Sequence, residues 1–278
     1  AHSAPGLDEN DVAVFFVMMR FAIAGLLLLV FVPKTWRGLK DREVWKGGLL
    51  LGVIVWGGFI LQMLGLTDIT PAVSAFLTSL YVVFTALIGV AFGMQKLTRF
   101  AILGVLLATF GAGWISGPPQ LNFGLGEWLT VGCAFLFGAH IIATDRVTKV
   151  VDPIQVTATM LITVAGLSIL VYLVVSREFT SEFITLLKEF DFTFPLMLCA
   201  VLGSLVALLV LNIFQKQVTP VRAAILYALE PVWAMLGSLV LGLEGEVTLW
   251  LPVGAVALLV GNLVVEYEQI IRSNDETE

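Results

Sequence analysis

TPVRAAILYALEPVWAMLGSLVLGLEGE, residues 219–246, is the most informative stretch of this chain. As a helix it is long enough to cross a bilayer, at about 1.5 Å per residue against roughly 30 Å of hydrocarbon. Near its middle lies Glu230, followed directly by Pro231. A carboxyl group at that depth costs about 2.5–3.5 kcal/mol to insert, so such residues usually have a function or a partner. The stretch is therefore predicted to be a membrane-spanning helix that carries a functional acid.

A second copy of this pattern occurs earlier, as TPAVSAFLTSLYVVFTALIGVAFG over residues 70–93. A shift of 149 residues places Thr70 on Thr219 and Gly93 on Gly242. A shift of 141 residues places Asp11 on Asp152. Each match is weak alone, but in series they indicate that the chain contains an internal repeat.

The composition is that of a membrane protein. Hydrophobic residues make up 59% of the chain and charged residues 13%, with a mean hydropathy of +0.99, whereas soluble domains are about 45–50% apolar and about 25% charged. The net charge of −6 comes mostly from the acidic start, one acidic loop and the tail, and predicts no nucleic-acid partner. Cys133 and Cys199 both fall in apolar runs, which favours small core residues over a disulfide or a metal site.

Nine apolar runs are long enough to be spans. They cover residues 12–32, 45–66, 71–93, 98–116, 124–144, 153–175, 194–214, 220–242 and 247–267. The longer link at 177–193 alternates apolar and acidic residues, which predicts an amphipathic helix lying at the membrane interface.

The Lys and Arg residues predict the orientation, because cytoplasmic loops are enriched in them. One set of alternate loops, with the tail, carries twelve of these residues. They are Lys34, Arg37, Lys40, Arg42, Lys46, Lys96, Arg99, Arg146, Lys149, Lys216, Arg222 and Arg272. The other set carries only Arg177 and Lys188. We therefore expect the C-terminus to be cytoplasmic and residue 1 to lie outside, in the plasma (inner) membrane of a prokaryote.

With this orientation Thr70-Pro71 lies outside and Thr219-Pro220 inside, so the repeats are predicted to be inverted, which requires an odd number of spans in each. The second repeat has five predicted spans and the first has four. We expect that the chain shown lacks a first helix, the alternative being a natural nine-span protein. The predicted fold is an all-α integral membrane protein with two inverted-topology helical repeats. The predicted domains are a first repeat over 1–116, a linker over 117–123, a second repeat over 124–268 and a cytoplasmic tail over 269–278.

Three segments carry a family resemblance: YALEPVWAMLGSLVLGLE (227–244), SAFLTSLYVVFTALIG (74–89) and VMMRFAIAGLLLL (17–29). With them the chain resembles the EamA-domain branch of the drug/metabolite transporter superfamily over residues 11–267. It departs from that pattern at Val82, where proline is frequent, and at Gln95, where glutamate is frequent. The resemblance implies ten helices in two inverted five-helix domains, a central cavity, and movement of small metabolites, often export.

Hydroxyl groups form a narrow stripe along the 71–93 span. On a helical wheel Ser74, Thr78, Tyr81 and Thr85 share one face, and the repeat places Tyr81 opposite Glu230. Matching polar faces on two related helices suit a shared substrate cavity. The alternative is that these hydroxyls bond their own backbone and let the helices pack closely.

Further candidates for the cavity are charged or aromatic. Glu230 is a candidate proton carrier, since burial raises the pKa of a carboxyl group; alternatively it is protonated and bonds a carbonyl freed by the kink at Pro231. Three roles are open for Arg20: pairing with Glu230, binding a substrate carboxylate, or reaching the lipid headgroups. Aromatic residues at mid-membrane depth suit planar or amphipathic solutes, although plain packing explains them equally. They are Trp56, Tyr81, Tyr227 and Trp233.

A secondary transporter that works by alternating access is the leading interpretation, its solute being amino-acid-like or a similar polar or amphipathic metabolite. A channel or lipid scramblase is the alternative, although no polar filter is visible. An intramembrane enzyme is disfavoured because no aspartate lies deep in a span and only His2 and His140 are available as imidazole ligands. We expect no cofactor and no metal. The expected partners are a small-molecule substrate, membrane lipids and protons. The small-xxx-small spacing of Gly89/Gly93 and Gly113/Gly117 favours tight packing of the hairpins over 71–116, with a homodimer face as the lesser alternative.

Overall fold

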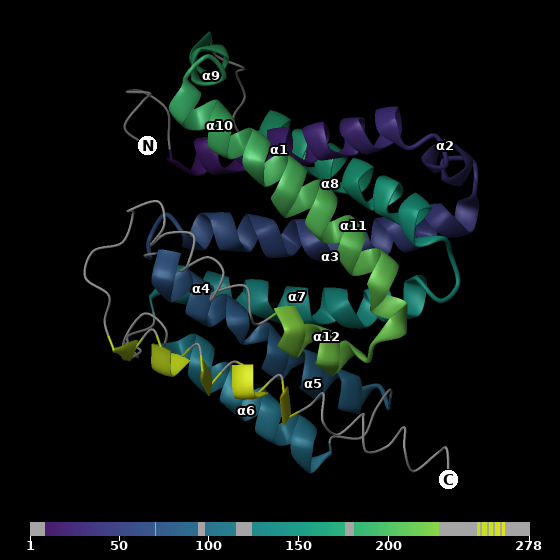
Figure 1. The fold of residues 1–278 in the computed structure, drawn as a ribbon. Helices are drawn as coiled ribbons and strands as arrows, with labels where there is room; N and C mark the ends of the chain where they lie inside the picture. Colours follow the sequence, from purple (N-terminus) through teal and green to yellow (C-terminus); the bar gives the residue numbers. More distant parts are fainter. Residues whose placement is uncertain are drawn as a thin grey trace. The chain divides into compact units, whose positions relative to one another are not determined.

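A computed structural model describes residues 9–69, 71–93, 98–114, 124–175 and 181–227, with short stretches between 249 and 264. The described regular structure is helical throughout (Figure 1). The chain forms two compact units, each drawn from both halves of the sequence. Unit 1 contains residues 1–67 and 143–217, and unit 2 contains residues 68–142 and 218–278.

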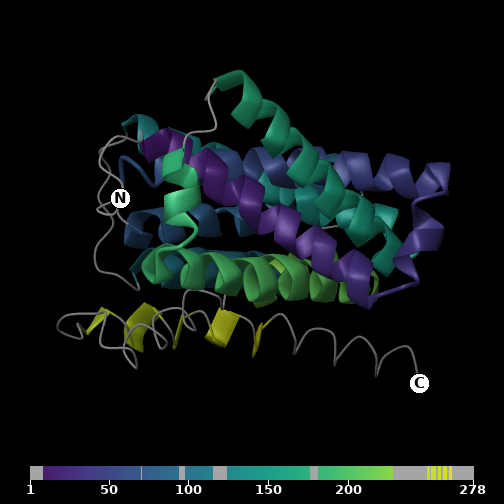
Figure 2. The same ribbon diagram turned by 90° about the horizontal axis from the view of Figure 1, so that it is seen from above.

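Unit 1 is built around helix α8 (Pro153–Val175), which packs against α1 (Glu9–Phe31) and α3 (Arg42–Gly65) (Figures 1 and 2). Two glycines make the contact between α3 and α8 close. A Cβ atom at Gly48 would lie 2.0 Å from Thr159 Oγ1, and one at Gly52 would lie 2.6 Å from Thr163 Cβ. Small residues at such positions allow membrane helices to approach each other, which increases their van der Waals contact.

The contacts along α8 fix the directions of its two neighbours. From Gly48 to Gly52 along α3, the contacts on α8 advance from Thr159 to Thr163, so these two helices are parallel. Between α1 and α8 the order is reversed. Lys34, just after α1, contacts Asp152, whereas Phe15 near the start of α1 packs against Tyr172 near the end of α8. Helices α1 and α8 are therefore antiparallel.

The remaining long element of unit 1 is a continuous but irregular helix. It consists of α10 (Phe190–Leu198), the π-helix η1 (Cys199–Val206), α11 (Ala207–Phe214) and the 3₁₀ turn η2 (Gln215–Gln217). Phe16 meets Phe192 and Arg20 meets Ser204, so this element runs parallel to α1. The predicted interfacial segment contains the short helix α9 (Ser181–Leu186), which buries Phe183 and Leu186 in an aromatic cluster with Phe15 and Tyr172.

Unit 2 contains α4 (Pro71–Ser79), α5 (Tyr81–Ala91), α6 (Arg99–Trp114), most of α7 (Leu125–Val147) and α12 (Pro220–Tyr227). Its core joins residues from all of these helices except α4. Gly138 of α7 makes one contact especially close, because a Cβ atom there would lie 3.0 Å from Thr85 N. The short helix α2 (Thr35–Gly38) follows α1 in unit 1.

Six stretches of the described chain are helical, long and apolar enough to cross a membrane, and Arg99–Gly111 and Pro252–Gly261 are shorter apolar helices. The six correspond to the predicted spans at 12–32, 45–66, 71–93, 124–144, 153–175 and 194–214. Most of the predicted span at 220–242 lies outside the described residues. The prediction of an all-α membrane protein is confirmed.

Candidate functional site

Arg20 is a charged side chain in the middle of α1, and it is held inside unit 1. Its Nε donates a hydrogen bond of 2.5 Å to Ser204 Oγ. Its guanidinium carbon lies 4.6 Å from the centroid of the Phe59 ring and 5.5 Å from that of Phe21. A cation over an aromatic face gains electrostatic stabilisation, more so when it is desolvated. These contacts direct the guanidinium group toward α3 and η1.

The π-helix η1 provides the surface that Arg20 contacts. Ser204, which is buried, accepts the hydrogen bond, and a Cβ atom on the preceding Gly203 would lie 3.0 Å from Arg20 Nη2. The glycine therefore leaves room for the guanidinium group. Segments of π-helix are rare and are often found at functional sites. Sequence analysis missed Ser204, because its distance from Arg20 along the chain hides the pairing.

Trp56 is a second candidate donor for a ligand in unit 1, in addition to Arg20. Its Nε1 is buried and has no hydrogen-bond partner among the described residues. Trp56 lies on α3 one turn before Phe59, the ring that contacts Arg20. A buried tryptophan N–H usually has a partner, so this donor is available to a ligand.

The hydroxyl stripe lies in unit 2 and is largely covered. Ser74, Tyr81 and Thr85 are buried, and Thr78 is hydrogen-bonded to Cys133 of α7. Thr85 Oγ1 donates to the carbonyl oxygen of Tyr81 at 2.7 Å. For Thr85, this contact matches the alternative in which the hydroxyl bonds a backbone carbonyl of its own helix.

The part of the predicted site around Glu230 lies largely outside the described residues. Tyr227, the last residue of α12, is half-buried and packs against the core of unit 2. Glu230, Pro231 and Trp233 follow it and are not among the residues that the structure describes.

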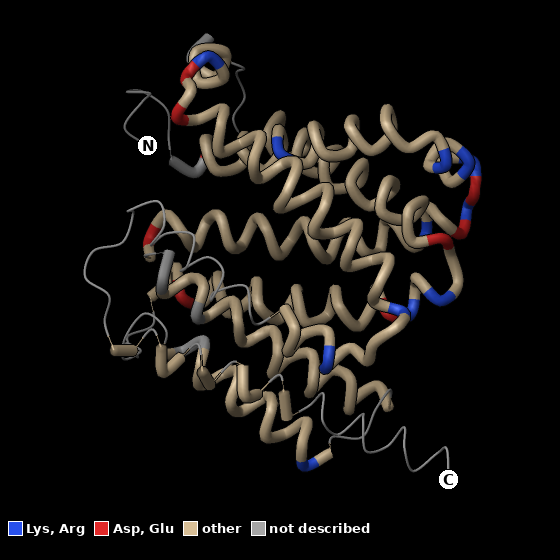
Figure 3. Tube along the Cα trace, viewed as in Figure 1, with Lys and Arg blue, Asp and Glu red and all other residues tan. Residues whose placement is uncertain are grey.

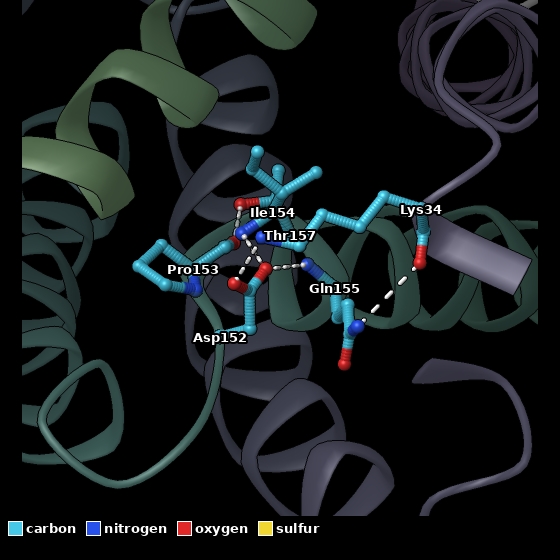
Figure 4. Close-up of polar contacts among 6 residues, drawn as sticks. All are labelled: Lys34, Asp152, Pro153, Ile154, Gln155 and Thr157. Atoms are coloured by element: carbon cyan, nitrogen blue, oxygen red, sulfur yellow. Dashed lines mark hydrogen bonds and ion pairs between the residues drawn. The ribbon is translucent and has the colours of Figure 1, made fainter. Parts of the chain in front are cut away.

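An ion pair lies at the start of α8 in unit 1 (Figure 4). Lys34 Nζ is 2.6 Å from Asp152 Oδ2, and Asp152 Oδ1 accepts hydrogen bonds from the backbone N–H groups of Ile154 and Gln155. Partial burial alone would raise the pKa of Asp152. The hydrogen bond and charge of Lys34, with the two backbone donors, outweigh burial and lower this pKa below its ordinary value.

Polar side chains also meet one turn further into α8. Asn212 Nδ2 donates to Thr157 Oγ1 at 2.7 Å, and Thr157 Oγ1 donates to the carbonyl oxygen of Pro153 at 2.6 Å. Thr157, Asn212 and Gln215 are fully buried. Sequence analysis missed this cluster, although Asn212 in the run ALLVLNIF is a visible signal.

Among the described residues, no three His, Cys, Asp or Glu side chains are grouped so that they could hold a metal ion. The candidate site around Arg20 offers hydrogen bonds, a partly buried guanidinium group and aromatic faces.

Comparison with known proteins gives three findings. The EamA-like transporter family matches residues 9–117 and 124–267. A relative from Archaeoglobus fulgidus, described as an uncharacterized transporter, is 29% identical over 227 residues, which cover 80% of this chain and 67% of the relative. The crystal structure of another protein is similar in fold, with a TM-score of 0.69 and 17% identity over 94% of this chain and 88% of that chain.

Proposed function

This chain belongs to the EamA-like transporter family of the drug/metabolite transporter superfamily, and on that premise we propose that it exports a small polar or amphipathic metabolite by alternating access. The family and the relative make it a membrane transporter. The proposed substrate is amino-acid-like and carries an anionic or strongly hydrogen-bond-accepting group.

The helix directions in unit 1 support inverted repeats. The predicted internal repeat relates α1 to α8 and α3 to the element from α10 to α11. Each of these two pairs is antiparallel in unit 1, as shown by the contacts described above. Inverted repeats allow a transporter to exchange outward-open and inward-open states by rearranging one repeat against the other.

The distribution of charge in unit 1 supports the proposed orientation. Basic residues gather at the end of the unit where α1 meets α3 and where α8 begins (Figure 3). The ion pair between Lys34 and Asp152 is at this end, and Lys188 lies beyond the opposite end of α8, after α9. Because cytoplasmic loops are enriched in Lys and Arg, we propose that the end with Lys34 faces the cytoplasm.

Arg20 carries the proposal for the substrate. A guanidinium group in a membrane helix is expensive to bury and usually has a function, and here one face is stabilised by Phe59 while one N–H is bonded to Ser204. A guanidinium group carries five N–H donors in a planar fork, whose geometry matches that of a carboxylate. The buried Nε1 of Trp56 is a further donor in the same unit. A site that presents donors suits a carboxylate or another acceptor group.

The other predicted site residues keep the same proposed roles. Ser74, Thr78, Tyr81, Thr85, Tyr227 and Trp233 are proposed to line the substrate path. Glu230 is proposed to carry the coupled proton, next to a kink at Pro231. A membrane carboxyl group that is protonated on one side and released on the other couples solute movement to the proton gradient.

The test begins with the purified protein and a panel of metabolites that carry carboxylate, neutral polar or aromatic groups. A ligand that binds only the folded state raises the unfolding temperature by mass action. We expect stabilisation by carboxylates, and saturable flux of the same compounds into liposomes. Flux that does not saturate would indicate a channel instead.

Substitutions of Arg20 then test the proposed site. Arg20→Lys keeps the charge but loses the fork of donors, and we expect the affinity for a carboxylate to fall by about 10- to 100-fold, the value of a charge-assisted hydrogen bond. Arg37→Lys, at an exposed position, is the matched control and should bind normally. An Arg20→Ala protein that folds and binds carboxylates with unchanged affinity contradicts the proposal.

A further inference from the structure

We propose that Thr157, Asn212 and Gln215 form a binding site for a monovalent alkali cation inside unit 1. This amide–hydroxyl cluster lies between the first turns of α8 and the end of α11, at the end of the unit that carries Lys34 and Asp152. It is separate from Arg20, and it does not depend on which solute the protein moves.

The hydrogen bonds of Thr157 determine how the Asn212 amide is oriented. The single hydroxyl proton of Thr157 is donated to the carbonyl oxygen of Pro153, so Thr157 Oγ1 can only accept from Asn212. Asn212 must therefore direct its NH₂ group at Thr157, and its Oδ1 is left without a hydrogen-bond partner among the described residues. The Oδ1 atom is an acceptor whose direction is fixed by its neighbours.

Gln215 provides a second buried amide in the same helical segment. It lies three residues after Asn212, so the two side chains share a helix face. Gln215 is fully buried, and neither Oε1 nor Nε2 has a hydrogen-bond partner among the described residues. An unsatisfied buried polar atom costs about 1–3 kcal/mol, whereas a leucine at either position would cost nothing of this kind. The cost indicates that these amides have a partner that the described part of the protein does not supply.

The chemistry of the cluster favours a cation. Asn212 and Gln215 provide two amide oxygens in the last turns of the continuous helix, which ends with η2 at Gln217. The C-terminal end of a helix carries a partial negative charge and unpaired carbonyl groups. Helix ends of this kind, with backbone carbonyls, bind coupling ions in membrane transporters.

The oxygen types favour a monovalent over a divalent ion. Calcium and magnesium ions are bound largely through carboxylates, and the three cluster residues contain none. The nearest described carboxylate along α8, that of Asp152, is already paired with Lys34. Neutral amide and hydroxyl oxygens compensate the dehydration of an ion of single charge, as carbonyl oxygens do in potassium channels. The competing occupant is a single buried water, which also bridges unsatisfied polar atoms.

The experiment uses the purified full chain in detergent with choline chloride, titrated with sodium, potassium or lithium chloride at constant ionic strength. We expect a saturable rise in unfolding temperature with at least one of these ions, and saturable binding of that ion in equilibrium dialysis. Asn212→Leu and Gln215→Leu should abolish both signals. Gln155→Leu is the control, because this amide lies on α8 two residues before Thr157 but bonds the Lys34 carbonyl oxygen, and it should keep both signals.

A second substitution keeps the test decisive if the leucine variants fail to fold. Gln215→Glu adds a carboxylate and should tighten cation binding by roughly tenfold, equivalent to about 1.4 kcal/mol. Equal unfolding temperatures in all chloride salts, with no ion retained in dialysis, would overturn the proposal in favour of a water site. Arg20→Lys should leave the cation signal unchanged, so a failure of the substrate proposal is distinguishable from a failure of this one.

Discussion

Asp152 does two things at the start of α8. One carboxylate oxygen accepts hydrogen bonds from the backbone of the first turn, and the other pairs with Lys34. The first contact satisfies N–H groups that a helix start leaves unpaired. The second joins the end of α1 to the start of α8 across 118 positions of the sequence. A single side chain thus fixes both a helix boundary and a tertiary contact.

We predict that Asp152→Asn destabilises the protein modestly and only above acid pH. Asparagine still caps the helix, so the loss is that of the charge. Because Lys34 is 51% exposed, solvent screening limits the effect to about 0.2–1 kcal/mol. The pKa of Asp152 is lowered on folding, so its contribution is present above the ordinary value of 3.8 and disappears as pH falls through the lowered folded value.

The measurement is the unfolding temperature of both proteins between neutral pH and pH 3, for as long as unfolding stays reversible. Lys34→Met should cause a similar loss, and the double variant should lose less than the sum of the two. A constant difference at all pH values would contradict the role of the charge.

At the scale of helices, the close contact between α3 and α8 depends on the absence of a Cβ atom at Gly48. Gly48→Ala places a Cβ atom 2.0 Å from Thr159 Oγ1 and 3.0 Å from the backbone nitrogen of Met160. The backbone atom cannot move without displacing α8, so we expect a destabilisation of about 1–3 kcal/mol or more from overpacking. The unfolding temperature of the purified protein is the measurement.

Gly166→Ala, on α8 itself, is the control for this prediction. A Cβ atom there meets nothing within 4 Å, and alanine favours the helix by about 0.8–1.0 kcal/mol over glycine. The two substitutions are chemically identical, so opposite effects would show that packing, and not helix propensity, determines the role of Gly48. Equal effects would contradict that interpretation.

At the scale of the molecule, the sequence predicts its helices better than its long-range contacts. Apolar length identifies the spans, because each must cross the same hydrocarbon thickness. It does not predict that each compact unit combines both halves of the chain. The pairing of Arg20 with Ser204 follows from that exchange, whereas Thr157 and Asn212 pair within the second half of the chain. Such contacts depend on which helices pack together, and hydropathy is nearly the same for every choice.

The orientation proposed for the whole protein gives the last prediction. Lys40 and Glu189 are exposed and lie beyond opposite ends of the α1–α8 pair, so cysteines placed there report on the two sides of the membrane. The background is a variant in which Cys133 and Cys199 are replaced by alanine. We expect a membrane-impermeant maleimide to label Glu189→Cys in intact cells and Lys40→Cys only in inverted vesicles. Labelling of both from the same side would contradict a membrane-spanning unit 1, whereas the reversed pattern would keep the fold and overturn the charge-based orientation, because the basic end would then lie outside.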